Sequence, residues 1–377
     1  MIAYFDSAAS YPLLPEVAAA LSSANESMIA NPSSQHTLGE DANNAVERCR
    51  SALADSIGAA PSEIIFTSGA TESNNLALKG HFSLPSAQAS RHLVISSIEH
   101  KCVHAIADYL NRTSGVSISL VQPNKAGIIT TAAIESALQP HTELVSIMHV
   151  NNELGTLNPI ADIGALCFER GIKFHTDAAQ SFLKTGIDVD DMNIDYASFS
   201  AHKIGGPKGI GALFIRDQRK QHMEPVVHGA GQEAGLRGGT VAAPLIQGFT
   251  AAISHFPKAY QSLKARGLKD LLLENLQKER IDHIVNGDGL PSILSLTLPN
   301  TDVQALLLNS GGTFALATGS ACSSKEIEVS HVLAAIGLDR MRAEHTLRLS
   351  FYHRNDVHEC DSLAKLITKY SNTSLIS

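Results

Sequence analysis

Between residues 60 and 216, short apolar runs rich in β-branched residues alternate with longer stretches of helical spacing, and this alternation constrains the fold more than any other feature. Some runs are apolar on both faces, as in the Val-Ser-Ile-Met sequence at 145–148, which suits strands covered by helices on each side. We expect an α/β fold with a mostly parallel, seven-stranded sheet, in which ligands bind at the carboxyl ends of the strands. The predicted strands are 64–67, 93–95, 116–121, 144–150, 172–176, 196–200 and 210–215.

The remainder of the chain predicts a second, smaller unit. Residues 259–280 have the spacing of an amphipathic helix that would connect the two units. Strands are predicted at 293–298 and 346–350, with helices near 303–308 and at 357–370. This order indicates a smaller α+β domain at the end of the chain, and the short N-terminal segment could join either domain.

Charge and cysteine content argue against several classes of protein. Acidic residues number 37 against 29 basic ones, and no stretch gathers five or six basic residues, so direct nucleic-acid binding is not expected. The first residues lack the basic and apolar regions of a signal peptide, and no 18-residue apolar run occurs, so a cytoplasmic protein without a membrane span is expected. The five cysteines include no Cys-x-x-Cys pair, so neither a metal site nor a disulfide framework is expected.

A lysine follows the predicted strand at 196–200. Lys203 stands between a hydroxyl–imidazole pair, Ser200 and His202, and the Gly-Gly-Pro turn at 205–207. A lysine amine forms a Schiff base with a carbonyl when its surroundings let it lose a proton, and glycines let the backbone approach a bound group closely. The alternative is a solvated loop lysine.

Two further strand ends carry groups that suit a phosphorylated ring compound. Asp177 follows the run at 172–176, where a carboxylate can pair with a protonated ring nitrogen, although it could instead cap a helix. After the run at 64–67, a helix begins near Ala70, and the free N–H groups of its first turn, with the Thr71 hydroxyl, favour a phosphate. The hydroxyl groups here could also be simple helix caps, and the segment lacks the Gly-Lys-Ser/Thr of a Walker loop.

Four more residues stand out by their setting. Cys322 lies in the small, polar segment Gly-Ser-Ala-Cys-Ser-Ser, where a thiol is expected to be exposed and mobile, as a nucleophile needs; the other four cysteines are expected in the core. His100 and Asn152 follow predicted strands, and an imidazole there could transfer protons or stack on a ring, or be an ordinary histidine. Arg348 is a charge inside an apolar strand pattern, so a carboxylate of the protein or of a substrate is expected beside it.

These motifs, together with Tyr-Phe-Asp-Ser-Ala-Ala-Ser at 4–10 and Asn-Pro-Ser-Ser-Gln-His at 31–36, carry a resemblance over nearly the whole chain. The sequence resembles the cysteine desulfurases of the NifS type, in the class V branch of fold type I pyridoxal-phosphate enzymes. The resemblance implies a large cofactor-binding domain at 15–257 and a small domain formed by 1–14 and 258–377. The small domain would carry a mobile cysteine loop at about 317–330.

The resemblance also implies a role for each motif. Lys203, in Ser-Ala-His-Lys, would hold pyridoxal 5'-phosphate covalently, and Cys322 would form a persulfide. Arg348 would bind the carboxylate of the substrate, L-cysteine, with Asn152 nearby. The other cofactor contacts would come from Ala70, Thr71, His100, Asn152, Asp177, Gln180, Ser200, His202 and, across a homodimer interface, Thr240.

The implied reaction converts L-cysteine to L-alanine. The substrate amine would displace Lys203, whose freed amine would take the α-proton with help from His100, while Asp177 would keep the ring nitrogen protonated. The Cys322 thiolate would then attack the substrate sulfur, and the sulfur would pass to an acceptor protein. Ser7 and Ser10 stand where relatives commonly have Asn and Thr, a change that this chemistry tolerates.

The sulfur acceptor stays open, and so do two alternative functions. After Tyr370 only a short tail follows, without the extension with which housekeeping relatives engage an iron–sulfur scaffold, so iron–sulfur assembly, tRNA thiolation and DNA phosphorothioation are alternatives. Selenocysteine lyase or another class V activity would use the same cofactor site, and Cys322 distinguishes a desulfurase from them. The alternative of another class is a non-catalytic scaffold for sulfur transfer.

Overall fold

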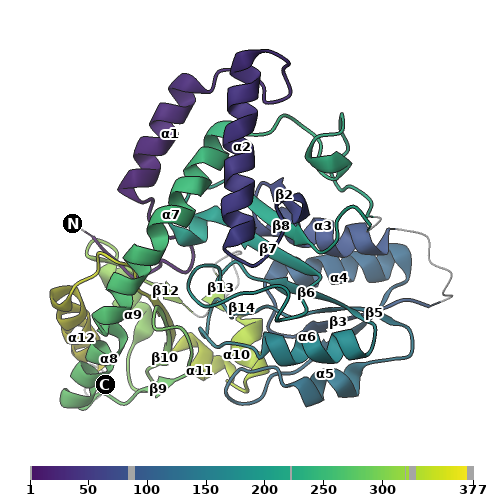
Figure 1. Cartoon of the computed structure of the whole chain (residues 1–377). Helices are drawn as coiled ribbons and strands as arrows, with labels where there is room; N and C mark the ends of the chain where they lie inside the picture. Colours follow the sequence, from purple (N-terminus) through teal and green to yellow (C-terminus); the bar gives the residue numbers. More distant parts are fainter. Residues whose placement is uncertain (1, 84–89, 221–222, 319, 322–327, 372–377) are drawn as a thin grey trace.

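The structure, a computed structural model, describes residues 2–83, 90–220, 223–318, 320–321 and 328–371. Its centre is a seven-stranded sheet with the order β2-β8-β7-β6-β5-β3-β4 (Figure 1). Neighbouring strands are parallel except where β8 pairs with β2 and β7, so the expected mostly parallel sheet is confirmed. The strands are β2 (Ile64–Thr67), β3 (His92–Ser96), β4 (Ser117–Val121), β5 (Thr142–Ser146), β6 (Lys173–Asp177), β7 (Tyr196–Ser200) and β8 (Gly211–Ile215).

Helices cover both faces of this sheet. In β3, Leu93 and Ile95 join one apolar cluster and Val94 joins another, and all three side chains are fully buried. This two-sided burial explains why the strands are apolar throughout rather than alternating. The first face is covered by α3 (Ala70–Phe82) and α4 (Lys101–Ser114), and the second by α5 (Thr131–Ala137) and α6 (Ile160–Glu169) (Figure 1).

The long helix α7 (Ala243–Ala265) connects the two parts of the molecule. It packs against α1 (Pro15–Ser27) and α2 (Thr37–Asp55) and leads to the second unit (Figure 1). The single helix expected at 259–280 is wrong, because the chain forms α7 and then α8 (Leu268–Lys278). Gly267 separates them with a φ of 55°, a left-handed conformation that ends a helix and that glycine adopts without strain.

A smaller α+β unit follows, as expected. Its main sheet has the order β12-β15-β10-β9, and β13 pairs with β14. The N-terminal strand β1 (Ala3–Tyr4) pairs in parallel with β11 (Phe314–Ala315), so the start of the chain packs on this unit. The other strands are β9 (Ile284–Val285), β10 (Ile293–Thr297), β12 (Ala317–Thr318), β13 (Ser320–Ala321), β14 (Glu328–Val329) and β15 (Thr346–Ser350). The helices are α8, α9 (Val303–Ser310), α10 (His331–Ala335), α11 (Arg340–Glu344) and α12 (Val357–Ser371).

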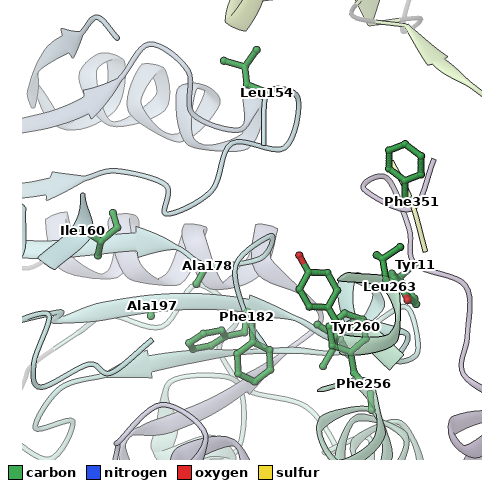
Figure 2. Close-up of a cluster of buried hydrophobic side chains, with 14 of the residues drawn as sticks. Tyr11, Leu154, Ile160, Ala178, Phe182, Ala197, Phe256, Tyr260, Leu263 and Phe351 are labelled. Carbon is green, nitrogen blue, oxygen red and sulfur yellow. The ribbon is translucent and has the colours of Figure 1, made fainter. Parts of the chain in front are cut away.

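The N-terminal segment also reaches the carboxyl edge of the large sheet. Tyr11 packs edge-on against Phe256 of α7 with ring centroids 5.0 Å apart, and Phe256 stacks on Tyr260 at 5.6 Å (Figure 2). The backbone N–H of Tyr11 donates to the carbonyl of His202 at 2.9 Å. The segment is therefore fixed beside the short 3-10 helix η2 (Ala201–Ile204), which carries Lys203. None of the helices in the described ranges is long and apolar enough to cross a bilayer.

Candidate active site

A cavity of about 680 Å³ opens at the carboxyl edge of the large sheet, beside the first turns of α3 and α4. Most of the site residues predicted from the sequence line this cavity, and two do not. Thr240 is exposed and lies outside the lining. Cys322 lies outside the described residues. The predicted residues in the lining are Ala70, Thr71, His100, Asn152, Asp177, Gln180, Ser200, His202, Lys203 and Arg348.

Lys203 follows β7 directly and presents its amine to the cavity. Nζ donates to the carbonyl oxygens of Ala8, at 2.6 Å, and Ala9, at 2.9 Å. Within the described residues these two carbonyl groups, rather than a carboxylate, are its hydrogen-bond partners. Burial lowers the pKa of Lys203 to about 8, and the positive charge of Arg348 also lowers it. The amine therefore loses its proton much more easily than a surface lysine does, as a carbonyl-binding amine must.

Asp177 ends β6 and is 6% exposed. Its Oδ2 accepts a hydrogen bond from Asn74 Nδ2 at 2.8 Å, and its Oδ1 accepts one from the Ala179 N–H at 3.0 Å. These two hydrogen bonds leave further lone pairs on both carboxyl oxygens. Asn74 was not among the residues predicted from the sequence. It lies in the polar run Thr-Glu-Ser-Asn-Asn at 71–75, where the sequence does not distinguish the buried Ser73 and Asn74 from their more exposed neighbours.

The first turn of α3 forms a cradle for an anion. The helix begins after Gly69, at a φ of 151°, and no side chain caps it. Its first N–H groups therefore have no acceptor within the helix and lie at the positive end of the helix dipole. Ser200 lies close by, since a Cβ on Gly69 would stand 3.6 Å from its Oγ. His202 also lines this cavity, and burial, with nearby lysines, lowers its pKa to about 4.

His100 caps α4, and this contact fixes its protonation pattern. Its Nδ1 accepts a hydrogen bond from the backbone N–H of Cys102 at 3.2 Å. The neutral ring therefore carries its proton on Nε2. Although the ring is open to the cavity, burial by the protein groups around it lowers its pKa.

Cys102 is a cavity residue rather than the core residue that the sequence predicted. It lines the cavity, and its Sγ lies 3.0 Å from Nδ1 of His100 and 3.4 Å from Nδ2 of Asn74. Burial and the charge of Asp177 raise its pKa to about 11, so the thiol stays protonated and is a poor nucleophile. The expectation of a core position holds for the other described cysteines, which are buried: Cys49, Cys167 and Cys360.

Arg348 lies in the middle of β15 and projects toward the same cavity. Its Nη2 contacts Asp6 Oδ1 at 2.7 Å, and its Nη1 donates to the Asn152 carbonyl at 3.3 Å. The carboxylate expected beside Arg348 is therefore Asp6, which the sequence pattern does not single out. The Nε of Arg348 is buried without a hydrogen-bond partner among the described residues, so the guanidinium keeps a donor for an incoming group.

Two described residues on the C-terminal side of Cys322 contact residues adjacent in the chain to the cavity lining. Ser330, the N-cap of α10, donates through Oγ to Glu153 Oε2 at 2.5 Å, next to Asn152 in the chain. His331 donates through Nε2 to the carbonyl of Glu99 at 2.8 Å, next to His100. The start of α10 is therefore fixed to the chain neighbours of two residues that line the cavity.

The donor set matches a phosphorylated pyridine aldehyde. An anion cradle without side-chain caps, a buried carboxylate and an amine with a lowered pKa surround one cavity. The anion cradle suits a phosphate, and the carboxylate of Asp177 suits a protonated ring nitrogen. The amine of Lys203 suits an aldehyde. The orphaned Nε of Arg348 adds a donor for a substrate carboxylate.

Comparisons with known proteins agree with this chemistry. The family described as Aminotransferase class-V matches residues 3–363. A Homo sapiens protein named "Cysteine desulfurase" is 40% identical over 364 residues, which cover 95% of this chain and 79% of that protein. The solved structure "SspA in complex with cysteine" is 43% identical with a TM-score of 0.84, and the match covers 93% of this chain and 98% of that one. The structure "NIFS-LIKE PROTEIN" is 32% identical with a TM-score of 0.89, over 98% of this chain and 99% of that one.

Proposed function

This chain belongs to the class-V aminotransferase family and is a cysteine desulfurase of the NifS type, and from that premise we propose that Lys203 and Cys322 carry its chemistry. In this proposal the enzyme converts L-cysteine to L-alanine and retains the sulfur as a persulfide on Cys322. Pyridoxal 5'-phosphate, when bound, supplies an aldehyde for amines and a protonated ring that withdraws electrons from the α-carbon of the substrate.

The residues around the cavity would hold that cofactor by complementary charge. The N–H groups of Ala70 and Thr71, with Ser200 and His202, would bind the phosphate. Asp177 would pair with the ring nitrogen. Four other residues complete the set: Gln180 and Asn152 toward the ring hydroxyl oxygen, His100 over the ring, and Thr240 of the partner subunit at the phosphate.

The chain's own groups would then bind the substrate and move its protons. Arg348 would bind the substrate carboxylate, shared with or displaced from Asp6. Lys203, with its lowered pKa, would take the α-proton once its amine is free. His100, with a proton on Nε2 and Nδ1 occupied by the Cys102 N–H, would act toward the cavity as a proton donor.

Sulfur transfer would be the work of Cys322. Its thiolate attacks the sulfur of the substrate, so that an S–S bond forms and the Cβ–S bond breaks, and the electron pair of that bond passes to the substrate carbon. Protonation of this β-carbon and return of a proton to the α-carbon by Lys203 give alanine, and the persulfide later passes its outer sulfur to an acceptor protein. The contacts of Ser330 and His331 to the chain neighbours of Asn152 and His100 support a role for this part of the chain near the cavity.

One observation carries this proposal: Lys203 faces the cavity that also contains the anion cradle and the buried Asp177, with carbonyl groups as its partners in the described structure. The test is to purify the protein with its cofactor, reduce it with borohydride and map the modified peptide. We expect the reduced cofactor on Lys203. Its recovery on another lysine would contradict the proposal.

A cysteine variant tests the second part of the proposal, the role of Cys322 in sulfur transfer. We expect Cys322→Ser to keep the absorbance of the bound cofactor but to produce neither alanine nor sulfide from L-cysteine in the presence of a reductant. The matched control is Cys360→Ser, at a buried thiol on α12, which should retain turnover. Undiminished turnover by Cys322→Ser would favour another class V activity instead.

The proposal extends to assembly, location and pathway. Thr240 is exposed, which suits a role at a homodimer interface. A thiolate nucleophile requires a reducing compartment, so we place the enzyme in the cytoplasm. The division into a large domain at 15–257 and a small domain from 1–14 and 258–377 is supported by the pairing of β1 with β11. The acceptor would serve iron–sulfur assembly, tRNA thiolation or DNA phosphorothioation, and transfer of labelled sulfur in a native lysate would identify it.

A further inference from the structure

Lys184 is a buried lysine that the proposed chemistry does not use. It lies in the turn after β6 and is 5% exposed. Its hydrogen-bond partner in the described structure is an amide, Gln180, rather than a carboxylate. The comparably buried Lys269, 9% exposed, instead donates to Asp288 at 3.0 Å. Since burying an amine without an opposite charge costs folding free energy, Lys184 calls for an explanation that Lys269 does not.

A chain of hydrogen bonds connects Lys184 to Lys203. The Nζ of Lys184 donates to Gln180 Oε1 at 3.0 Å, and Gln180 Nε2 donates to the carbonyl of Ala8 at 2.7 Å. The same carbonyl accepts from Lys203 Nζ at 2.6 Å. An ammonium can only donate, so Lys184 determines which end of the Gln180 amide is its oxygen. The amide nitrogen is thereby directed to Ala8, which lines the cavity.

The charge of Lys203 also acts on Lys184. Burial lowers the pKa of Lys184 to about 7, and the positive charge of Lys203 contributes to this shift. Burial and Arg348 lower the pKa of Lys203, while Asp177 and Asp6 oppose the shift. Because Lys203 has the higher pKa, about 8, it takes up its proton first as the pH falls, so a charge on Lys184 does not account for the lowered pKa of Lys203. The other titratable side chains in the cavity lining are Glu72, His100, Cys102, His202 and Lys208.

We propose that Lys184 is a positioning residue for the amine of Lys203. It fixes the orientation of the Gln180 amide, so that the amide nitrogen shares the Ala8 carbonyl with the amine of Lys203. This inference rests on the proposed function in one respect, that Lys203 is the amine that reacts. The hydrogen bonds from Lys184 to Gln180 and from Gln180 to Ala8 are present in the protein without cofactor.

The test measures the titration of Lys203 directly in the cofactor-free chain. Amines are labelled competitively with acetic anhydride across a pH series, and mass spectrometry of the Lys203 peptide gives the pH midpoint of its reactivity. Lys184→Met keeps a side chain of similar length without a donor for Gln180, so the amide is free to turn away from Ala8. The Ala8 carbonyl then accepts from the Lys203 ammonium without a competing amide, and we expect the midpoint to rise by on the order of half a pH unit. The matched control, Lys269→Met, removes a buried amine outside the cavity lining and should leave the midpoint unchanged.

Two measurements on the holoenzyme complement the labelling. The pH midpoint of the cofactor absorbance should rise in Lys184→Met, and kcat should fall several-fold, while KM for L-cysteine stays within about twofold because Arg348 is untouched. Lys184→Gln restores a donor to Gln180 without the charge, so its midpoint and kcat should return toward those of the natural chain. Lys184→Leu, which also lacks a donor, replaces Lys184→Met in the labelling experiment if that variant does not fold.

Several outcomes would overturn the proposal. An unmoved Lys203 midpoint in the variant without a donor would contradict it, and so would a midpoint that stays raised in Lys184→Gln or an equal shift in Lys269→Met. The proposed function fails separately: a chain with the shifted midpoint that produces no alanine from L-cysteine contradicts the desulfurase chemistry and supports the role of Lys184.

Discussion

The two ends of the seven-stranded sheet carry the same kinds of charged side chain in opposite arrangements. At the amino ends, Arg91 pairs with Glu143 at 2.5 Å across the starts of β3 and β5, and Lys173 pairs with Asp195 at 2.7 Å across the starts of β6 and β7. At the carboxyl ends, Asp177 accepts from an amide and a backbone N–H, and Lys203 donates to carbonyl groups.

This difference separates stability from chemistry within one sheet. Opposite charges that pair across neighbouring strands satisfy each other and stabilise the fold. Charges whose partners are neutral groups cost folding free energy, but they remain available to a ligand of opposite charge or to an aldehyde. We therefore expect substitutions at the carboxyl edge to remove activity with little loss of stability, and substitutions at the amino edge to do the reverse.

The largest effect on activity is expected for Asp177, the buried carboxylate at the end of β6. Asp177→Asn should lower kcat about a thousand-fold, because an amide does not hold a ring nitrogen in its protonated form. The matched control is Asp195→Asn at the amino edge, which removes the partner of Lys173 and an acceptor for the Phe174 N–H but should keep kcat within about twofold. Steady-state rates and urea unfolding of both variants measure the difference between the two edges of the sheet. Equal losses of kcat in the two variants would contradict that difference.

Arg348, which reaches the cavity from β15 of the smaller unit, breaks the pattern, because it lines the cavity and yet has a carboxylate partner, Asp6. Arg348→Ala should raise KM for L-cysteine about a hundredfold, since a charge-assisted contact to the substrate carboxylate is lost. Arg348→Lys should recover only part of this, because an ammonium cannot form the bidentate contact. Asp6→Asn should lower KM a few-fold by removing a competing carboxylate. A fall in kcat with unchanged KM in Arg348→Ala would mean that this residue acts on chemistry rather than on binding.

His100 combines a stabilising contact and a cavity position in one side chain, because Nδ1 caps α4 and the ring lines the cavity. His100→Asn keeps an acceptor for the Cys102 N–H but removes the donor at Nε2, so we expect kcat to fall about 10-fold to 100-fold with little change in melting temperature. The control Thr130→Ala removes the cap of α5 and should cost about 1 kcal/mol of stability without changing kcat. Because the pKa of His100 is lowered, its protonation should add no step to the pH profile of kcat at about pH 6.5, the ordinary value for histidine. A step there that disappears in His100→Asn would contradict this.

The sequence predicts the parts of the site that follow strands, and it does so for a physical reason. In a parallel sheet, residues just beyond the carboxyl ends of buried strands converge at one edge, so strand order and spacing alone are enough to group Asp177, Ser200 and Lys203. The seven strands are predictable for a related reason, since burial on both faces makes them apolar throughout.

The missed residues depend on contacts between segments that are distant in the chain. Lys203 meets the carbonyl of Ala8 across 195 positions, and Arg348 meets Asp6 across 342. Lys184 belongs to a polar turn and looks exposed in the sequence, because its burial depends on tertiary packing. The break at Gly267 was missed because the apolar spacing of a helix continues across it.

The smallest effect on activity is expected at the amino edge, where Glu143 joins Arg91 and His81. Burial alone would raise the pKa of Glu143, but hydrogen bonds from His81 and Arg91 outweigh it and hold the pKa at about 2 instead of 4.5. A carboxyl group with a depressed pKa stabilises the fold above its ordinary pKa, and this contribution is lost as the pH falls toward the depressed value. Glu143→Gln should therefore lower the free energy of unfolding by about 1–3 kcal/mol at neutral pH, with kcat unchanged. Urea unfolding at decreasing pH should show that the difference in free energy of unfolding between the variant and the natural chain becomes smaller from about pH 4.5 downward. A difference that stays constant with pH would assign the stability to packing rather than to this charge pair.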